Sequence, residues 1–299
     1  MLASLTYFQA IVMGLVQGVT ELFPVSSLGH GVLLPGVLGW HNLVSSQSQS
    51  QSFFLVFLVC LHVGTALGLI VFYRATWFKL FKGLQRQLRV SREEGASSLW
   101  RLSNEQMDRD YRLLLLLVLG SIPVGIVGVV LEKPLRELFA KPLAAAIFLT
   151  VNGVILLVGE RMRNNRGRHA HYEKIDTLSG RNAFAIGAAQ ILALFAGISR
   201  SGVTMVAGLT RGLDHEDAAN FSFLLATPVI LLAGLYKLPS LMGHLGQGVR
   251  SQTLVGALCA GVAAYVAVRF LTRWFTTKTL NPFGIYCLVA GLACVVRFA

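Results

Sequence analysis

The sequence has few charged residues and few cysteines for its length. Of its 299 residues only 13% are charged, while 54% are hydrophobic; a soluble domain carries about a quarter charged residues. All four cysteines lie inside apolar runs and none has CxxC spacing, so we expect packing residues and neither disulfides nor a thiolate metal site. The first apolar run continues into Glu21 and Pro24 without a small-residue cleavage site, so we expect no signal peptide.

The sequence contains long apolar segments. Six of them, at about 18–21 residues each, are long enough to cross or nearly cross the hydrocarbon core of a bilayer. These expected spans are 53–73, 112–131, 142–159, 218–237, 252–270 and 281–298. The sequence therefore predicts an all-α integral membrane protein that forms a single membrane domain over residues 1–299, with the lipid bilayer as its partner.

Two further stretches, within 3–40 and 183–212, are copies of each other at a constant offset of 173 residues. The offset superposes Gly14 on Gly187, Gln17 on Gln190, Ser26 on Ser199 and Gly29 on Gly202. Small and polar residues interrupt each copy at what we call the first hinge (24–30) and the second hinge (197–204). Irregular backbone at membrane depth is tolerated only inside protein or beside a water-filled cavity, so we expect two re-entrant helical hairpins.

Each half of the chain, about 1–160 and 161–299, then holds one re-entrant hairpin and three crossings. Three is an odd number, so the second half begins on the opposite side of the membrane from the first. The repeats are therefore expected to be inverted, with both hinges directed at the membrane midplane, an arrangement that builds polar sites in lipid.

The distribution of basic residues sets the expected orientation. Nineteen of the 26 Lys and Arg residues fall in loops on one side, namely 74–112, 160–182, 211–217 and 269–279. The positive-inside rule makes this side cytoplasmic and puts the first hinge and both termini on the periplasmic side. It also accounts for the net charge of +12, so we expect no nucleic-acid partner. The cytoplasmic loop 74–112 is expected to contain an amphipathic surface helix around residues 77–88.

The first hinge and the helix before it supply a carboxylate, hydroxyls and an imidazole. A charge at the centre of a spanning helix costs roughly 2.5–3.5 kcal/mol on insertion scales, so Glu21 is expected to be functional or to have a partner. Gln17 lies one turn earlier on the same face. Ser26, Ser27 and His30 follow within the hinge, where free backbone N–H groups at a helix start favour an anion.

The second hinge supplies the positive charge. Arg200 is embedded in an apolar stretch between Ser199 and Ser201. Its guanidinium suits bidentate binding of phosphate or carboxylate, or a buried ion pair with Glu21. Elsewhere, His62 is expected to pack within its span, and Ser222 could line the cavity.

These groups together suit a phosphate-bearing substrate. Hydrolysis of a phosphate ester needs a nucleophile, a general base and positive charge on the equatorial oxygens. Ser27 or a water molecule could attack, Glu21 or His30 could take the proton, and Arg200 could hold the phosphoryl oxygens.

The same residues resemble the motifs of the undecaprenyl pyrophosphate phosphatase (bacitracin-resistance) family of bacterial inner-membrane enzymes. The resemblance covers essentially the whole chain. Its motifs are Gln17-x-x-x-Glu21, Pro-Val-Ser-Ser-x-Gly-His at 24–30, Gly-x-Ser-Arg-Ser-Gly-x-Thr at 197–204 and Phe-Ser-Phe-Leu-Leu-Ala at 221–226. Ala196 stands where the family usually has Pro, and Gln17 stands where it often has Glu.

The resemblance implies removal of the terminal phosphate from a C55 polyprenyl diphosphate, giving the monophosphate carrier of cell-wall synthesis and resistance to bacitracin. It implies a divalent metal, Mg²⁺ or Ca²⁺, with Glu21 and Gln17 as ligands, and leaves a homodimer open. The catalytic residues that it implies are Glu21, Ser27, His30 and Arg200. The phosphate-binding residues that it implies are Ser26, Ser199, Ser201, Gly202 and Thr204.

Two other classes of protein share parts of this pattern. Inverted repeats with a midplane Glu/Arg site also describe secondary transporters or flippases, although the serine-rich first hinge favours chemistry. The lipid phosphatase superfamily with Lys…Arg-Pro, Pro-Ser-Gly-His and Ser-Arg…His motifs is rejected, because no Lys…Arg-Pro precedes the first hinge and no His follows Arg200 at the required spacing.

Overall fold

The computed structural model describes residues 5–47, 53–99, 107–131, 141–165, 174–243 and 248–299, and within these ranges it contains helices and no strands. The α-helices are α1 (Tyr7–Thr20), α2 (Ser27–Val37), α3 (His41–Gln47), α4 (Phe53–Phe72), α5 (Arg74–Glu94), α6 (Arg109–Val130), α8 (Pro142–Asn164), α9 (Gly180–Ala189), α10 (Arg200–Thr210), α11 (His215–Met242), α12 (Arg250–Trp274) and α13 (Asn281–Phe298). Short 3₁₀ helices are η1 (Ala96–Leu99), η2 (Ile175–Thr177) and η3 (Gln190–Leu194).

Six of these helices are long and apolar enough to cross a membrane: α4, α6, α8, α11, α12 and α13. They match the six expected spans and extend beyond several of them by a few residues. The prediction of an all-α multi-pass membrane protein is confirmed. The re-entrant hairpins, the inverted repeat and the two halves stay predictions, since they depend on where the bilayer lies.

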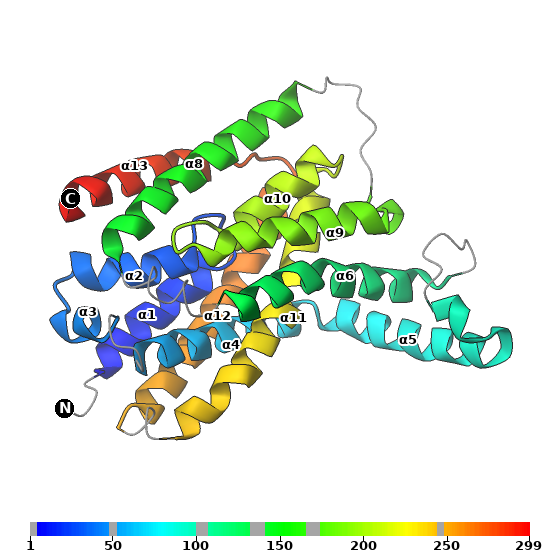
Figure 1. Cartoon of the computed structure of the whole chain (residues 1–299), viewed down its shortest axis with the longest axis horizontal. Helices are drawn as coiled ribbons and strands as arrows, with labels where there is room; N and C mark the ends of the chain where they lie inside the picture. Colours follow the sequence, from blue (N-terminus) through cyan, green and yellow to red (C-terminus); the bar gives the residue numbers. More distant parts are fainter. Residues whose placement is uncertain (1–4, 48–52, 100–106, 132–140, 166–173, 244–247) are drawn as a thin grey trace.

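The arrangement of the helices brings the first copy against the end of the chain. α12 packs against both α1 and α4, and α8 packs against α13. The start of α1 and the end of α13 lie toward one end of the long axis, and the α5–α6 pair lies toward the other (Figure 1). The expected orientation requires the chain termini and the α5–α6 pair to lie at opposite ends. Which of these ends is periplasmic stays a prediction.

The described parts of the polar segment 74–112, residues 74–99 and 107–112, are more helical than expected. The surface helix predicted around 77–88 is the longer α5, which packs against α6 with Leu80 and Gly83 buried, while Phe78, Phe81 and Leu88 stay exposed. Arg86 ties the two helices together, with its Nε 2.6 Å from Asp108 Oδ2 and its Nη2 2.7 Å from Asp110 Oδ2. The hydrogen bonds from Arg86 lower the pKa of the Asp108 carboxyl.

Close contact between α1 and α12 depends on glycine. A Cβ at Gly18 would lie 2.2 Å from the Ala260 carbonyl oxygen. We expect Gly18→Ala to lower the free energy of unfolding by about 1–3 kcal/mol, because the helices must move apart. Gly125→Ala on α6, where a Cβ meets nothing within 4 Å, is the control and is expected to be neutral or to stabilise by up to ~1 kcal/mol. Thermal unfolding in detergent makes the comparison; equal losses in both variants would contradict it.

Candidate active site

The two hinges are built in the same way at corresponding positions. Ser26 is the N-cap of α2, and its Oγ accepts a hydrogen bond from Gly29 N at 3.1 Å. Ser199 is the N-cap of α10, and its Oγ accepts from Gly202 N, also at 3.1 Å. These caps start the helices earlier than expected. The residues from Ser27 and from Arg200 onward therefore lie in first helical turns, so the irregular backbone is shorter than the hinges 24–30 and 197–204 that the sequence predicts.

The two hinges are also bonded to each other. Ser26 has a positive φ of 70°, which is uncommon for a residue other than glycine, and its Oγ accepts a second hydrogen bond from Gly197 N at 3.2 Å. Asn152, fully buried on α8, bridges them as well. Its Nδ2 donates to Pro24 O at 3.0 Å, and its Oδ1 accepts from Ser199 N at 2.9 Å. The sequence prediction missed Asn152, although a polar residue inside an apolar span was the available signal.

Glu21 is the centre of the polar contacts and is almost fully buried. Its Oε1 accepts a hydrogen bond from Arg200 Nη2 at 2.7 Å. Its Oε2 accepts from Ser27 Oγ and, at 3.1 Å, from Gln17 Nε2. His62 Nε2 lies 3.2 Å from the same oxygen. The buried ion pair with Arg200, one of the two interpretations of that residue, is therefore present.

A cavity of about 270 Å³ opens beside this cluster. Its polar lining comes from Glu21, Ser26, Ser27, His62, Gln190, Ser199 and Arg200. The remaining lining is apolar and comes mainly from α4 and α11. Arg200 Nη1 is buried and has no hydrogen-bond partner among the described residues. A buried charged donor without an acceptor is costly, and an anion in the cavity would supply that acceptor.

The structure places two histidines differently from the sequence prediction. The His30 ring is directed to α13, with Nδ1 2.7 Å from Ser26 O and Nε2 2.7 Å from Tyr286 Oη. His30 does not line the cavity. His62, expected only to pack, is the imidazole beside Glu21. Its position in the middle of an apolar span was the signal that could have found it.

The remaining residues predicted to bind phosphate lie behind the cavity rather than in its lining. Ser201 Oγ is 3.0 Å from Ser199 Oγ and donates to Phe23 O at 3.2 Å. Thr204 Oγ1 is 2.5 Å from Ser222 Oγ, so Ser222 supports this turn of α10. Gly202 contributes its N–H to the cap on Ser199. These groups hold the start of α10 in place.

The donor set limits how a divalent metal could bind. Among the described residues no group of three His, Cys, Asp or Glu side chains is placed to hold a metal ion. Mg²⁺, however, is often bound through one or two carboxylates, with substrate phosphates completing its shell. Glu21 is the one carboxylate in the described lining of the cavity. The residues therefore fit a metal that binds together with a diphosphate.

His62 gives a prediction that the sequence alone did not suggest. We expect His62→Asn to lower kcat for the reaction at this site by roughly 10- to 100-fold, because a hydrogen bond to a charged group contributes about 1.5–3 kcal/mol. Thr65→Val, one turn along α4, is the matched control and is expected to keep its activity, because the Thr65 hydroxyl donates to Leu61 O within its own helix. Steady-state kinetics on both variants makes the test. A His62→Asn enzyme as fast as the control would remove His62 from the site.

Comparison with known proteins shows the family of this chain. The family described as bacitracin resistance protein BacA matches residues 10–293. The chain is 47% identical to undecaprenyl-diphosphatase 2 of Frankia alni, over 99% of this chain and 98% of the relative. It is 48% identical to the undecaprenyl-diphosphatase of Mycolicibacterium paratuberculosis, over 100% and 99%, and 42% identical to undecaprenyl-diphosphatase 2 of Chromobacterium violaceum, over 95% and 96%. The chain belongs to the bacitracin resistance protein BacA family.

Proposed function

We propose that this protein is an undecaprenyl-diphosphate phosphatase. It hydrolyses the C55 polyprenyl diphosphate to the monophosphate and inorganic phosphate, and so recycles the lipid carrier of peptidoglycan synthesis. The names of relatives that are 41–48% identical along nearly the whole chain support this substrate. The transporter or flippase alternative is not favoured, since none of these names describes transport.

One observation carries the proposal from the site itself. Arg200 offers Nη2 to Glu21 at 2.7 Å, and in the described part of the chain its buried Nη1 has no hydrogen-bond partner. The guanidinium is thus held by the carboxylate while part of its donor capacity is unused. Phosphoryl oxygens are acceptors that match this fork, and preorganised positive charge stabilises the charge of the phosphoryl transition state.

In the proposed reaction the Ser27 Oγ attacks the terminal phosphorus, and its proton passes to Glu21 Oε2, with which it already shares a hydrogen bond. The bond from that phosphorus to the bridging oxygen breaks, and the polyprenyl monophosphate leaves. Water then attacks the phosphoserine, and one of its protons passes to Oγ as the bond from phosphorus to Oγ breaks. Inorganic phosphate is released, and Glu21 gives up to it the proton taken from Ser27. Direct attack by water gives the same products, and full activity in a Ser27→Ala variant would select that route.

His62 and the divalent metal complete the proposed chemistry. His62, 3.2 Å from the Glu21 carboxylate, orients the base toward Ser27. Glu21 and the amide oxygen of Gln17 are the groups that would hold Mg²⁺ or Ca²⁺. When bound, the metal would neutralise charge on the diphosphate.

The cellular setting is part of the same proposal. We place the protein in the bacterial inner membrane, with the first hinge and both termini on the periplasmic side. The surplus of basic residues in the loops of the opposite side supports this orientation.

The proposal is tested by release of inorganic phosphate from undecaprenyl diphosphate by the purified protein in detergent, with and without Mg²⁺. Detergent removes any transmembrane gradient, so a transporter would release nothing. We expect release that depends on the metal. Well-folded protein that releases no phosphate with any divalent metal would overturn the proposal.

A further inference from the structure

A second cavity, of about 500 Å³, lies at the carboxyl-terminal end of α12, apart from the candidate active site. Basic and aromatic side chains dominate its lining: Val266, Arg269, Phe270, Arg273, Trp274, Thr277 and Lys278. None of these residues is acidic. In the described part of the chain, Arg269, Arg273 and Lys278 make no ion pair, whereas Arg86, Lys174 and Arg200 each have an acidic partner. Three unneutralised cations around one hollow favour an anionic ligand.

Packed aromatic rings fix the shape of this cavity. Phe270 stacks on Phe23, with ring centroids 5.9 Å apart and planes 2° apart. Trp274 lies against both Phe270 and Phe283, at 5.7 and 5.9 Å between centroids, and its Nε1 donates to Thr279 O at 3.3 Å. Arg269 and Arg273 are four residues apart, so they share one face of α12. The two guanidiniums therefore rise from a preformed aromatic wall.

An apolar track leads away from the basic cavity along α12. Its side chains are spaced four residues apart and are 48–71% exposed: Leu254, Leu258, Val262, Val266 and Phe270. At 1.5 Å per residue the track is about 24 Å long, enough to follow a lipid chain through much of the hydrocarbon core.

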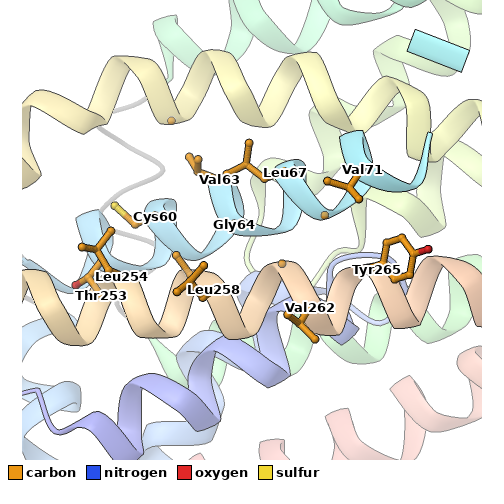
Figure 2. Close-up of a pocket in the computed structure, with 14 residues that line it drawn as sticks. Cys60, Val63, Gly64, Leu67, Val71, Thr253, Leu254, Leu258, Val262 and Tyr265 are labelled. Atoms are coloured by element: carbon orange, nitrogen blue, oxygen red, sulfur yellow. The ribbon is translucent and has the colours of Figure 1, made fainter. Parts of the chain in front are cut away.

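The far part of this track borders an apolar groove of about 510 Å³ between α4 and α12. Figure 2 shows Leu254, Leu258 and Val262 of α12 along the groove, with Val63 and Leu67 of α4 beside it. Three glycines on these helices are part of its lining and let α4 and α12 approach closely: Gly64, Gly68 and Gly261. The groove thus continues the apolar surface that begins at the two arginines.

We propose that this combined surface binds an anionic phospholipid. The phosphate of its headgroup lies between Arg269 and Arg273, beside Trp274, and one acyl chain follows the track on α12 into the groove. A long apolar surface that ends in paired cations matches a molecule with one anionic phosphate and long hydrocarbon chains. Basic pockets at the cytoplasmic face bind such headgroups, and α12 ends on the side expected to be cytoplasmic.

The site is separate from the proposed reaction. Neither the basic cavity nor the groove is lined by Glu21, Ser27 or Arg200. It does adjoin the first hinge, because Phe23, whose carbonyl accepts a hydrogen bond from Ser201 Oγ, is the ring on which Phe270 stacks. Binding of phospholipid here does not require the protein to be a phosphatase.

The test measures binding of phosphatidylglycerol and of phosphatidylcholine with the same acyl chains to the purified full-length protein, by native mass spectrometry. We expect the wild type to prefer phosphatidylglycerol, and Arg269→Gln/Arg273→Gln to weaken that binding about tenfold or more, since each basic residue near an anionic lipid contributes measurably. Arg161→Gln/Arg181→Gln removes the same charge from exposed positions outside the cavity and is expected to bind normally. Equal binding of both lipids by the wild type, or equal losses in the two double variants, would overturn the proposal.

A second measurement locates the lipid and does not depend on the arginine variants. Phosphatidylglycerol with brominated acyl chains near the headgroup is expected to quench tryptophan fluorescence of the wild type more than brominated phosphatidylcholine does. The difference is expected to disappear in Trp274→Phe. Persistence of the difference in that variant would move the lipid elsewhere, and displacement of the brominated lipid by an equimolar polyprenyl monophosphate would assign the site to that lipid instead.

Discussion

Replacing Arg200 by alanine is expected to lower kcat/KM for phosphate release by at least about 100-fold, the scale found for removal of a preorganised donor from a charged transition state. Arg200 lines the cavity, and its Nη2 donates a hydrogen bond to Glu21 Oε1 at 2.7 Å. The substitution removes the clamp for the phosphoryl oxygens and leaves a buried carboxylate with a weaker partner in His62.

The loss of stability in Arg200→Ala must be separated from the loss of phosphate binding. Breaking a buried ion pair by removing one partner can cost 3–5 kcal/mol of stability. Arg200→Lys is the control. It keeps the positive charge, and with it much of the stability, but loses the planar fork that binds phosphate through two donors. We expect Arg200→Lys to unfold near the wild-type temperature and to remain strongly impaired in turnover. An Arg200→Ala variant within a few-fold of wild-type activity would exclude Arg200 as the clamp.

Glu21→Gln is expected to have the larger effect on the chemical step, with kcat lowered roughly 10²- to 10⁴-fold, the range for loss of a general base. Glutamine has nearly the same shape, so the cavity persists. It lacks the charge that accepts the Ser27 proton and that holds Arg200 in place. Kinetics of phosphate release, with excess Mg²⁺ to offset weaker metal binding, measures the loss.

A matched control exists on α8. Glu160 is also almost fully buried, and its Oε2 lies 2.8 Å from His215 Nε2, but it does not line the active-site cavity. We expect Glu160→Gln to lower stability and to keep kcat within a few-fold of wild type. If both glutamine variants lost activity equally, burial of a carboxylate and not its place at the hinges would explain the effect of Glu21.

The parts of this molecule that could be predicted from the sequence are those where a polar residue interrupts an apolar run. Such residues are costly in a membrane, so Glu21 and Arg200 stood out although they are far apart in the chain. The six spans were equally visible, because their length and composition are set by the bilayer. Pairing of the hinges followed from the repeat at Ser26 and Ser199, and both serines are N-caps in the structure.

The direction of individual side chains could not be predicted in the same way. Ser27 and His30 lie in one short stretch, and the sequence does not say where the helix begins. With α2 starting at Ser27, the hydroxyl of Ser27 meets Glu21, while His30 turns to Tyr286 of α13. His62 and Asn152 were missed for a related reason. A lone polar residue in a span usually forms its hydrogen bonds locally, and only the packing of α4 and α8 brings His62 to Glu21 and Asn152 to both hinges.

The central claim is that residues from both hinges form one phosphatase site, and a double-mutant cycle between them tests it most directly. The rate of phosphate release would be measured for Ser26→Ala, Ser199→Ala and the double variant. Groups in one hydrogen-bond network couple by about 0.5–3 kcal/mol, whereas independent sites add within ~0.3–0.5 kcal/mol. The account predicts that the two losses in kcat/KM are not additive. Additive losses would mean that the hinges act independently, and would contradict the claim that they form one site.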